Sequence, residues 1–329
     1  MNLKKVLITD RFAQDTFLYL QQQSFLEVVR SAHPYHLPEE HLTSAHALLI
    51  RSRTKIDEAL LKKARNLQVI ITATSGFDHI DLEATQKWGV TVMHTPRANI
   101  ESAAQLTWSL VLACAHNTFS GHKMVRAGEW HRDQITGIEL SGRTYGIIGL
   151  GRIGSRVAEI AQVFGMNVAA YDPYQEDEVF EKLRIPRLSY EEVLKTADVL
   201  SFHVPKTAET DYMLNRSQFE YIHRGIILIN TSRGSVIKEA DLVEALENNW
   251  IRAAGLDVFE KEPLSRDSKL LRHGNVILTP HIGANTEDAF YKASSYAAQK
   301  LISFLIDGST SDTLPPRVPW YGATPFKSE

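Results

Sequence analysis

The chain has 329 residues, of which 43% are hydrophobic and 23% charged, and its formal net charge at pH 7 is −3. These values suit a soluble globular protein with two domains. The net negative charge excludes a strongly basic protein, which would attract nucleic acid or an anionic membrane. The single cysteine, Cys114, excludes an intramolecular disulfide and a cysteine-built metal site, as expected in the reducing cytoplasm.

Short apolar runs alternate with helical patterns at the start of the chain. The apolar runs are predicted to be strands, at residues 5–9, 47–50, 67–71 and 90–93, and helices are expected between them. Apolar runs of this length that alternate with helices indicate a parallel sheet. We therefore expect a small doubly wound α/β domain here.

The alternation of strands and helices breaks at residues 95–99. Pro96 disfavours a helical conformation in the residue before it, and Asn99 can cap the helix that follows. We expect the chain to cross into a second domain at this point. A long helix is predicted over residues 100–120, and its polar interruptions favour a buried helix over a membrane span. The stretch 123–140 is predicted to be an irregular arm whose Trp130 is buried against a partner subunit.

A glycine-rich turn joins a predicted strand at residues 145–148 to a predicted helix at 155–164. Gly149 permits the turn, Gly151 lets the backbone approach a pyrophosphate, and Gly154 lets the helix pack closely on the strand. The pyrophosphate is expected at the helix N-terminus, where unpaired N–H groups and the helix dipole favour an anion. This pattern predicts a dinucleotide-binding Rossmann fold.

Asp172 follows the next predicted strand and stands eighteen residues after Gly154. A carboxylate here can accept hydrogen bonds from the 2′- and 3′-hydroxyls of the cofactor's ribose, and it would repel a 2′-phosphate. The sequence therefore predicts NAD as the cofactor in preference to NADP.

The strand and helix alternation resumes after Asp172. Helices are predicted between strands at residues 199–204, 226–230, 253–258 and 276–279. A final helix over 286–306 has the length and apolar spacing to return to the first domain. We therefore expect a discontinuous substrate-binding domain of residues 1–98 and 287–329, and a NAD-binding domain of residues 99–286.

The tail from Gly308 onward is rich in proline and has no strong periodicity. Two expectations remain open for it. It is either disordered or lies on a neighbouring subunit through Trp320 and Tyr321.

Three polar sites follow predicted strands in the second half, at Arg233, Asp257 and His281. Ligands bind beyond the carboxyl ends of strands in parallel sheets. Glu262 can orient the imidazole and raise its pKa, which suits a histidine that exchanges a proton near pH 7. Arg233 supplies a rigid fork for a carboxylate. The histidines lack H-E-x-x-H spacing, so no metal site is predicted.

Four motifs occur in the order and spacing of the NAD-dependent D-2-hydroxyacid dehydrogenases, at residues 149–154, 230–234, 255–263 and 279–283. The chain resembles this family over residues 51–308. The resemblance implies two doubly wound parallel-sheet domains, with a Rossmann NAD-binding domain inserted into a discontinuous flavodoxin-like substrate domain. It also implies a homodimer formed through the NAD-binding domain, and an active site in the cleft between the domains.

The resemblance also implies roles for individual residues. His281 is expected to be the acid/base, Glu262 its partner, and Arg233 the anchor for the substrate's carboxylate and carbonyl groups. Asp257 is expected to face the nicotinamide carboxamide. The expected cofactor contacts are Gly149, Gly151, Arg152, Ile153, Gly154, Asp172, His203, Val204, Thr231, Ser232, Arg233, Asp257, His281 and Gly283.

The family's substrate loop appears at residues 74–81, where N–H groups of Ser75 and Gly76 are expected to meet the substrate's carboxylate. Two positions depart from the family's pattern. Thr74 stands where the family often has glycine, which leaves the shape of the loop open. Gln105 stands where the family usually has glutamate, so hydrogen bonding is kept without the charge.

Within the family, the resemblance is closest to the D-3-phosphoglycerate dehydrogenases. Arg51 and Arg53 match the segment that meets the substrate's phosphate, and Arg132 matches an arginine that reaches in from the other subunit. These matches imply 3-phosphoglycerate or 3-phosphohydroxypyruvate as substrate and a role in serine biosynthesis. Because the resemblance ends near Gly308, we expect no counterpart of the regulatory domain that longer members carry.

Other functions remain open at this point. The same motifs suit a hydroxypyruvate or glyoxylate reductase, and relatives of this fold also serve as NAD-sensing corepressors without catalysis. Formate dehydrogenases of this fold are a weaker alternative, because they pair the histidine with glutamine where this chain has Glu262.

Overall fold

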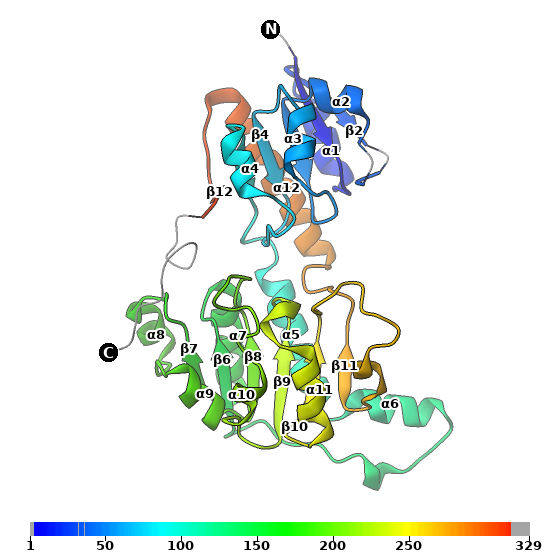
Figure 1. Ribbon diagram of the computed structural model, residues 1–329, viewed down its shortest axis with the longest axis vertical. Helices are drawn as coiled ribbons and strands as arrows, with labels where there is room; N and C mark the ends of the chain where they lie inside the picture. Colours follow the sequence, from blue (N-terminus) through cyan, green and yellow to red (C-terminus); the bar gives the residue numbers. More distant parts are fainter. Residues whose placement is uncertain (1–2, 32, 36, 317–329) are drawn as a thin grey trace. The chain divides into compact units, whose positions relative to one another are not determined.

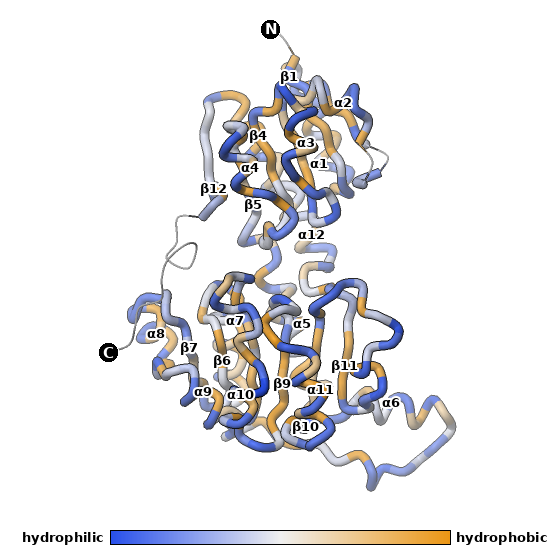
Figure 2. The backbone as a smooth tube through the Cα atoms, in the orientation of Figure 1, coloured by the Kyte–Doolittle hydropathy of each residue, from blue (hydrophilic) through white to orange (hydrophobic). Residues whose placement is uncertain are grey.

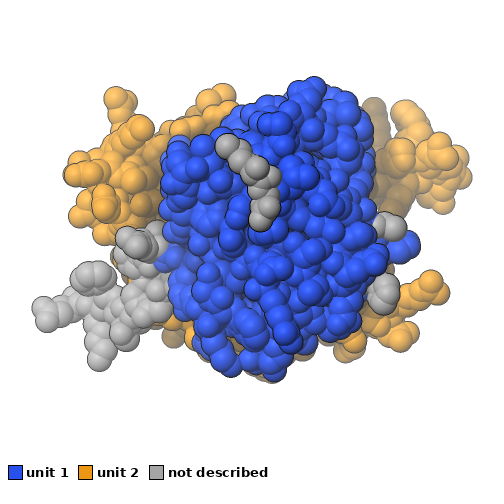
Figure 3. All heavy atoms as spheres, turned by 90° about the horizontal axis from the view of Figure 1, so that it is seen from above, with its two compact units in different colours: residues 1–99, 285–323 blue, residues 100–284, 324–329 orange. Residues whose placement is uncertain are grey.

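The structure is a computed structural model that describes residues 3–31, 33–35 and 37–316 (Figure 1). It contains two compact units, coloured separately in Figure 3. Unit 1 holds the described residues up to Asn99 and from Asn285 onward, and unit 2 holds Ile100–Ala284. Trp320 and Tyr321, which were expected either in a disordered tail or on a neighbouring subunit, lie outside the described residues.

Unit 1 is built on a six-stranded sheet with the order β12-β5-β4-β3-β1-β2. The first five strands of the chain are parallel, and β12 adds antiparallel to β5. The strands are β1 (Lys4–Ile8), β2 (Leu26–Arg30), β3 (Ala47–Ile50), β4 (Val69–Thr72), β5 (Thr91–His94) and β12 (Thr313–Leu314).

Two strands of unit 1 were not predicted from the sequence. Strand β2 lies at the edge of the sheet, where Leu26 alone of its five residues is buried, so its apolar pattern is weak. Strand β12 falls in the proline-rich tail, and of its two residues Leu314 is buried and Thr313 is partly buried. Its position is decided by pairing with β5, which no local pattern reveals.

Helices cover both faces of this sheet. Helices α1 and α12 cover the face of Val6 and Ile8, and α2, α3 and α4 cover the face of Leu7 and Leu48. Because both faces are buried, the central strands β3 and β4 are almost entirely apolar, and β4 is coloured hydrophobic in Figure 2. The helices are α1 (Gln14–Gln21), α2 (Glu39–Ser44), α3 (Glu58–Lys63), α4 (Leu82–Lys87) and α12 (Glu287–Asp307).

Unit 2 is built on a six-stranded parallel sheet with the order β11-β10-β9-β8-β6-β7. A single bridge between Ala170 and Arg187 lies beyond β7, where the third strand of a Rossmann sheet runs. The strand order reverses between β6 and β8. The strands are β6 (Thr144–Ile148), β7 (Asn167–Tyr171), β8 (Val199–Phe202), β9 (Ile226–Asn230), β10 (Ile251–Leu256) and β11 (Val276–Leu278).

The helices of unit 2 lie on both faces of the sheet, with α5, α7 and α8 on one face and α9, α10 and α11 on the other. Short 3₁₀ turns lie at η1 (Arg132–Gln134), η2 (Gly234–Val236) and η3 (Lys269–Arg272). The helices are α5 (Ile100–Ala115), α6 (Thr118–Arg126), α7 (Arg152–Val163), α8 (Asp177–Leu183), α9 (Tyr190–Thr196), α10 (Arg216–Phe219) and α11 (Glu239–Glu247).

The prediction of one helix over residues 100–120 was wrong. Helix α5 ends at Ala115, and Asn117 adopts a left-handed conformation with φ of 52° before α6 begins. The Asn117 side chain donates a hydrogen bond to the Thr136 carbonyl oxygen at 2.8 Å, which ties the break to the returning arm. Among the described residues, no helix combines the length and the apolarity that crossing a membrane requires.

Candidate active site

The glycine turn lies between β6 and α7, at the point where the strand order of unit 2 reverses. Gly149 has φ of +92°, and a Cβ there would lie 2.8 Å from the carbonyl oxygen of His203. A Cβ on Gly154 would lie 2.0 Å from the carbonyl oxygen of Gly149. Only glycine fits these two positions, because the protein's own backbone fills the space.

Gly151 differs from the other two glycines of the turn. It caps the N-terminus of α7, and a Cβ there would meet no protein atom within 4 Å. Arg152 and Ile153 are the first residues of the helix, whose N–H groups have no partner within the helix. The open space beside Gly151, next to these N–H groups, fits the pyrophosphate of a dinucleotide.

Asp172 follows β7 and lies beside the turn. Its Oδ2 accepts a hydrogen bond from Leu150 N at 2.8 Å, and its Oδ1 accepts from Tyr174 N at 3.0 Å and Gln175 N at 3.1 Å. A carboxylate has about four acceptor sites, so capacity remains for a ligand hydroxyl. The sequence did not reveal that Asp172 also fixes the backbone of the turn.

The His203 side chain forms a hydrogen bond within the protein. Its Nε2 lies 2.8 Å from Ser201 Oγ, and burial lowers the pKa of His203 to about 3, so the ring is neutral near pH 7. The carbonyl oxygen of His203 and the Val204 side chain both pack against Gly149. The structure thus gives both residues a part in shaping the turn.

The segment after β9 is organised by Asn230, which is buried. Its side chain accepts hydrogen bonds from N and Oγ of Ser232, at 3.0 and 2.9 Å, and donates to the Arg233 carbonyl oxygen at 2.9 Å. Thr231 Oγ1 lies 2.8 Å from Thr107 Oγ1 of α5. These bonds fix the backbone from which the Arg233 side chain extends.

His281 and Glu262 are in direct contact, with His281 Nδ1 2.8 Å from Glu262 Oε2. Glu262 Oε1 also accepts a hydrogen bond from Phe259 N at 3.2 Å. About half of the His281 side chain is exposed, at 48%. The imidazole is therefore held at one nitrogen and remains accessible to solvent.

Asp257 is fully buried and holds the backbone around His281. Its Oδ1 accepts from Ile282 N and Thr279 Oγ1, at 2.8 and 2.6 Å, and its Oδ2 accepts from Gly283 N at 2.8 Å. His281 has φ of 53°, which is unfavourable for a residue with a side chain, so fixed partners are needed to hold it. The sequence did not predict this role of Asp257.

The charges of the site shift both pKa values. The hydrogen bond to Glu262 raises the pKa of His281 above its ordinary value, although burial and Arg233 oppose the rise. For Glu262, burial raises the pKa, but the His281 hydrogen bond and the charges of His281 and Arg233 outweigh it and hold the pKa below its ordinary value. The three side chains therefore lie within electrostatic reach of one another, and the ion pair of His281 and Glu262 is favoured.

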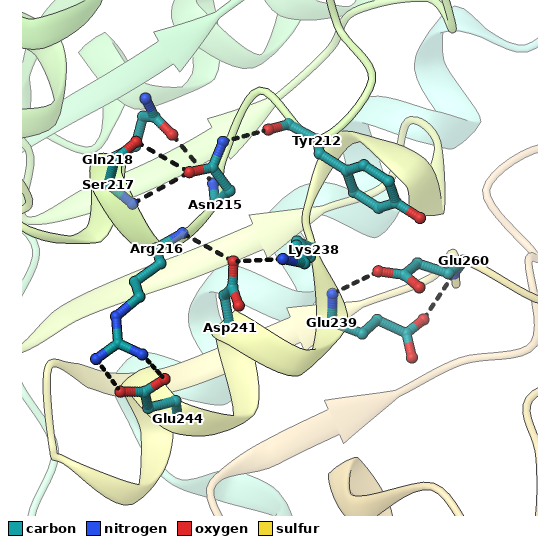
Figure 4. A network of polar contacts seen from close by, with 10 residues as sticks. All are labelled: Tyr212, Asn215, Arg216, Ser217, Gln218, Lys238, Glu239, Asp241, Glu244 and Glu260. Carbon is teal, nitrogen blue, oxygen red and sulfur yellow. Dashed lines mark hydrogen bonds and ion pairs between the residues drawn. The ribbon is translucent and has the colours of Figure 1, made fainter.

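The segment that carries Glu262 is anchored to α11 by a pair of carboxylates (Figure 4). Glu260 Oε1 accepts from Glu239 N at 2.7 Å, and Glu239 Oε1 accepts from Glu260 N at 2.6 Å. Gly234 packs directly on this segment, because a Cβ there would lie 1.8 Å from the Phe259 carbonyl carbon. The segments of Arg233 and Glu262 are thus fixed to each other.

The predicted substrate loop of unit 1 is held by side-chain hydrogen bonds to its carbonyl oxygens. Thr74 Oγ1 donates to the Gly76 carbonyl oxygen at 2.7 Å, and His94 Nδ1 lies 2.9 Å from the Ser75 carbonyl oxygen. Thr74, which replaces the family's usual glycine, therefore stabilises the loop. Within the described chain, the N–H groups of Ser75 and Gly76 donate no hydrogen bond, so both are available to an anion.

Arg51 and Arg53 lie together at the carboxyl end of β3. Buried Asp10 accepts from Arg51 N at 2.9 Å, Thr54 Oγ1 at 2.9 Å and Arg53 Nε at 3.2 Å. Asp10 was not predicted, although it follows the neighbouring strand β1 and could have been found from that position. Arg132 lies apart from these residues in sequence, in the exposed arm of unit 2.

Residues 108–283 match the NAD binding domain of the D-isomer specific 2-hydroxyacid dehydrogenases. The chain belongs to this family. The predicted fold class and the predicted cofactor, NAD, are thereby confirmed.

Individual relatives cover most of the chain. It is 38% identical to D-3-phosphoglycerate dehydrogenase of Bacillus subtilis, over 91% of this chain and 57% of that protein. It is 37% identical to glyoxylate reductase of Aeropyrum pernix, over 82% of this chain and 83% of that protein. D-lactate dehydrogenase from Aquifex aeolicus, complexed with NAD and lactic acid, matches with a TM-score of 0.83 and 31% identity, over 93% of this chain and 96% of that chain.

Proposed function

We propose that this chain transfers a hydride between NAD(H) and a D-2-hydroxy acid or its 2-keto acid, with 3-phosphoglycerate and 3-phosphohydroxypyruvate as the preferred pair. The observation that carries the proposal is the 2.8 Å hydrogen bond between His281 and Glu262, beside Arg233 and on the same unit as the glycine turn. Turnover of NADH with a panel of 2-keto acids tests it.

The residues around the turn fit NAD. Gly151 leaves room for the pyrophosphate, and Asp172 offers acceptor capacity to the ribose hydroxyls. NAD supplies the acceptor or donor of the hydride when it is bound. The chain's own part is to hold the substrate and to move one proton.

In reduction of a 2-keto acid, His281 Nε2 gives its proton to the substrate's carbonyl oxygen while Glu262 stabilises the imidazolium at Nδ1. In oxidation of the hydroxy acid, the neutral ring takes the proton back. The Arg233 guanidinium binds the substrate's carboxylate and stabilises negative charge at the carbonyl oxygen.

Replacing Glu262 by glutamine tests the pairing through pH. The amide keeps a hydrogen bond to His281 but removes the charge that raises its pKa. Reduction requires the protonated ring, so its rate in Glu262→Gln should decline at a lower pH than in the wild type. Oxidation requires the neutral ring, so its acidic limit should also move to lower pH. Kinetic pH profiles in both directions measure this shift, and Glu247→Gln, an exposed acid at the end of α11, should leave both profiles unchanged. Unmoved profiles in Glu262→Gln contradict the pairing.

Asp172 is expected to make the protein prefer NADH. A 2′-phosphate beside its carboxylate brings two like charges together, which costs at least about 1.4 kcal/mol, or tenfold in affinity. We expect kcat/KM with NADH to exceed that with NADPH by tenfold or more. Equal values for the two cofactors would remove Asp172 from the ribose site.

The arginine pair of unit 1 supports a phosphorylated substrate. Arg233 suffices to anchor one carboxylate, so Arg51 and Arg53 are surplus for lactate or glycerate. Arg53→Ala should lower kcat/KM for 3-phosphohydroxypyruvate by about tenfold to a hundredfold, because a hydrogen bond to a charged group contributes about 1.5–3 kcal/mol. Hydroxypyruvate serves as the control substrate and should change little. Equal losses on both substrates would indicate a general defect in folding.

A second function is favoured by one finding. The chain is 37% identical to the glyoxylate reductase of Aeropyrum pernix, nearly the same as its 38% identity to the D-3-phosphoglycerate dehydrogenase of Bacillus subtilis. If the phosphorylated substrate is not used, hydroxypyruvate or glyoxylate reduction becomes the preferred assignment.

We also propose that the protein is a cytoplasmic homodimer formed through α6 and the arm at residues 123–140 of unit 2. Helix α6 buries none of its residues, and Phe119, Val125 and Trp130 are 50%, 56% and 77% exposed. An apolar surface of this kind suits a partner subunit. Arg132 of the same arm would then meet the phosphate of a substrate in the other subunit. Light scattering of the protein in solution measures the assembly.

A further inference from the structure

Unit 1 has a ligand position of its own. Its strand order, with β2 and β3 on opposite sides of β1, reverses between β1 and β3. Doubly wound sheets of this order bind ligands beyond the carboxyl ends of the strands at that reversal. Asp10 and Arg11 follow β1, and Arg51 and Arg53 follow β3, so all four residues lie at this point.

Arg11 is the residue of this group that the proposed function does not use. Its guanidinium carbon lies 5.0 Å from the centre of the Phe290 ring, and that of Arg51 lies 5.0 Å from the same ring. Phe290 belongs to α12, which packs on the sheet of unit 1. One aromatic ring therefore holds two guanidinium groups near each other, by attraction between each cation and the ring.

The positive charge of this cluster is only partly balanced. Among the described residues, Asp10 is the one carboxylate that forms a hydrogen bond or ion pair with these arginines. Three arginines and one acid leave the cluster with a charge of +2. Arg11 makes no ion pair within the described part of the chain. Arg51 Nη1 is buried and has no hydrogen-bond partner there. A buried guanidinium nitrogen without an acceptor is costly, and a dianion with several oxygens would satisfy it.

The crowding itself favours an anion. Burial lowers the pKa of Arg51, and the charges of Arg53 and Arg11 lower it further, although Asp10 opposes them. Repulsion among the three guanidinium groups is present without a ligand and is relieved when a dianion binds among them. Phe290 and Asp10 hold the arginines in place beforehand, so less side-chain entropy is lost on binding.

We propose that Arg11, held on Phe290, is a third cationic contact for a dianionic group of the substrate and determines its specificity together with Arg51 and Arg53. This inference rests on the proposed function for the identity of the substrate. The chemical class that fits is a phosphate monoester. A second carboxylate carries a single charge and fits a cluster of charge +2 less well.

The test compares Arg11→Gln with a matched variant, Arg30→Gln. The guanidinium carbon of Arg30 also lies over an aromatic ring of unit 1, 4.2 Å from the centre of the Phe17 ring. Arg30 is the last residue of β2, however, and the strand order reverses between β1 and β3. We expect Arg11→Gln to lower kcat/KM for 3-phosphohydroxypyruvate tenfold or more, mainly through KM, and to change that for hydroxypyruvate less than twofold. Arg30→Gln should change neither. Phe290→Leu should give a smaller loss in the same direction, and it serves as the test if Arg11→Gln does not fold.

Equal losses on both substrates, or no loss on either, overturn the role of Arg11 while leaving the dehydrogenase assignment intact. If the wild type reduces no 2-keto acid, the proposed function fails, and calorimetric binding of 3-phosphoglycerate decides the inference alone. Binding that Arg11→Gln weakens tenfold and Arg30→Gln leaves unchanged supports the dianion site. Equal binding by the variants, or none by the wild type, overturns it.

Discussion

His281→Asn should reduce turnover by about 10²- to 10⁴-fold while leaving NADH binding nearly unchanged, because general acid catalysis contributes a factor of this size. Asparagine suits the test because it tolerates the left-handed backbone that His281 adopts, with φ of 53°. The hydrogen bonds from Asp257 to the backbone of Ile282 and Gly283 do not depend on the imidazole. The loop should therefore keep its shape in the variant.

Steady-state kinetics and NADH fluorescence titration measure the two quantities on the same preparation. His223→Asn, an exposed histidine in unit 2, is the control and should match the wild type in both. A His281→Asn protein that keeps near wild-type turnover on every accepted substrate rules out His281 as the acid/base.

Two substitutions in the glycine turn should separate cofactor binding from folding. Gly151→Ala places a methyl group where no protein atom lies within 4 Å, so stability should not change, yet NADH affinity should fall tenfold or more. Gly154→Ala places its methyl group 2.0 Å from the Gly149 carbonyl oxygen, so the turn must move. We expect that variant to lose affinity and also about 1–3 kcal/mol of stability, as overpacked sites do.

Calorimetry gives the affinities, and denaturant unfolding gives the stabilities. Gly274→Ala is the control for substitution itself, since a Cβ there also meets nothing within 4 Å and its φ is not in the left-handed region. Wild-type affinity in Gly151→Ala would mean that the pyrophosphate does not lie at the N-terminus of α7.

The parts of the fold that a local pattern encodes were predictable. Fully buried strands such as β3 and β9 are almost entirely apolar, and α11 (Glu239–Glu247) lies between the strands predicted at 226–230 and 253–258, where a helix was expected. The two edge strands of unit 1 were missed, because β2 buries one face weakly and β12 depends on a pairing partner more than 200 residues away in the sequence, β5. The break at Asn117 was also missed, since its hydrogen bond to Thr136 is a tertiary contact.

In the candidate site, too, some residues could be predicted from the sequence and others could not. His281, Glu262 and Arg233 were singled out by residue type at strand ends, and the structure places them within one another's electrostatic reach. The residues that hold them were not predicted in that role. Asn230 fixes the segment of Arg233, and Asp257 fixes the backbone beside His281, both through buried hydrogen bonds to loop backbone. Such bonds depend on three-dimensional contacts and have no periodic signal in the sequence.

The proposed activity is tested by NADH oxidation by the full chain with 3-phosphohydroxypyruvate, hydroxypyruvate, glyoxylate and pyruvate, with His281→Asn as the blank. We expect turnover of at least one 2-keto acid, the D-hydroxy acid as product, and the highest kcat/KM with 3-phosphohydroxypyruvate. A protein that binds NADH tightly but oxidises it with none of these acids is not a dehydrogenase of 2-hydroxy acids, and a non-catalytic, NAD-sensing role is then favoured.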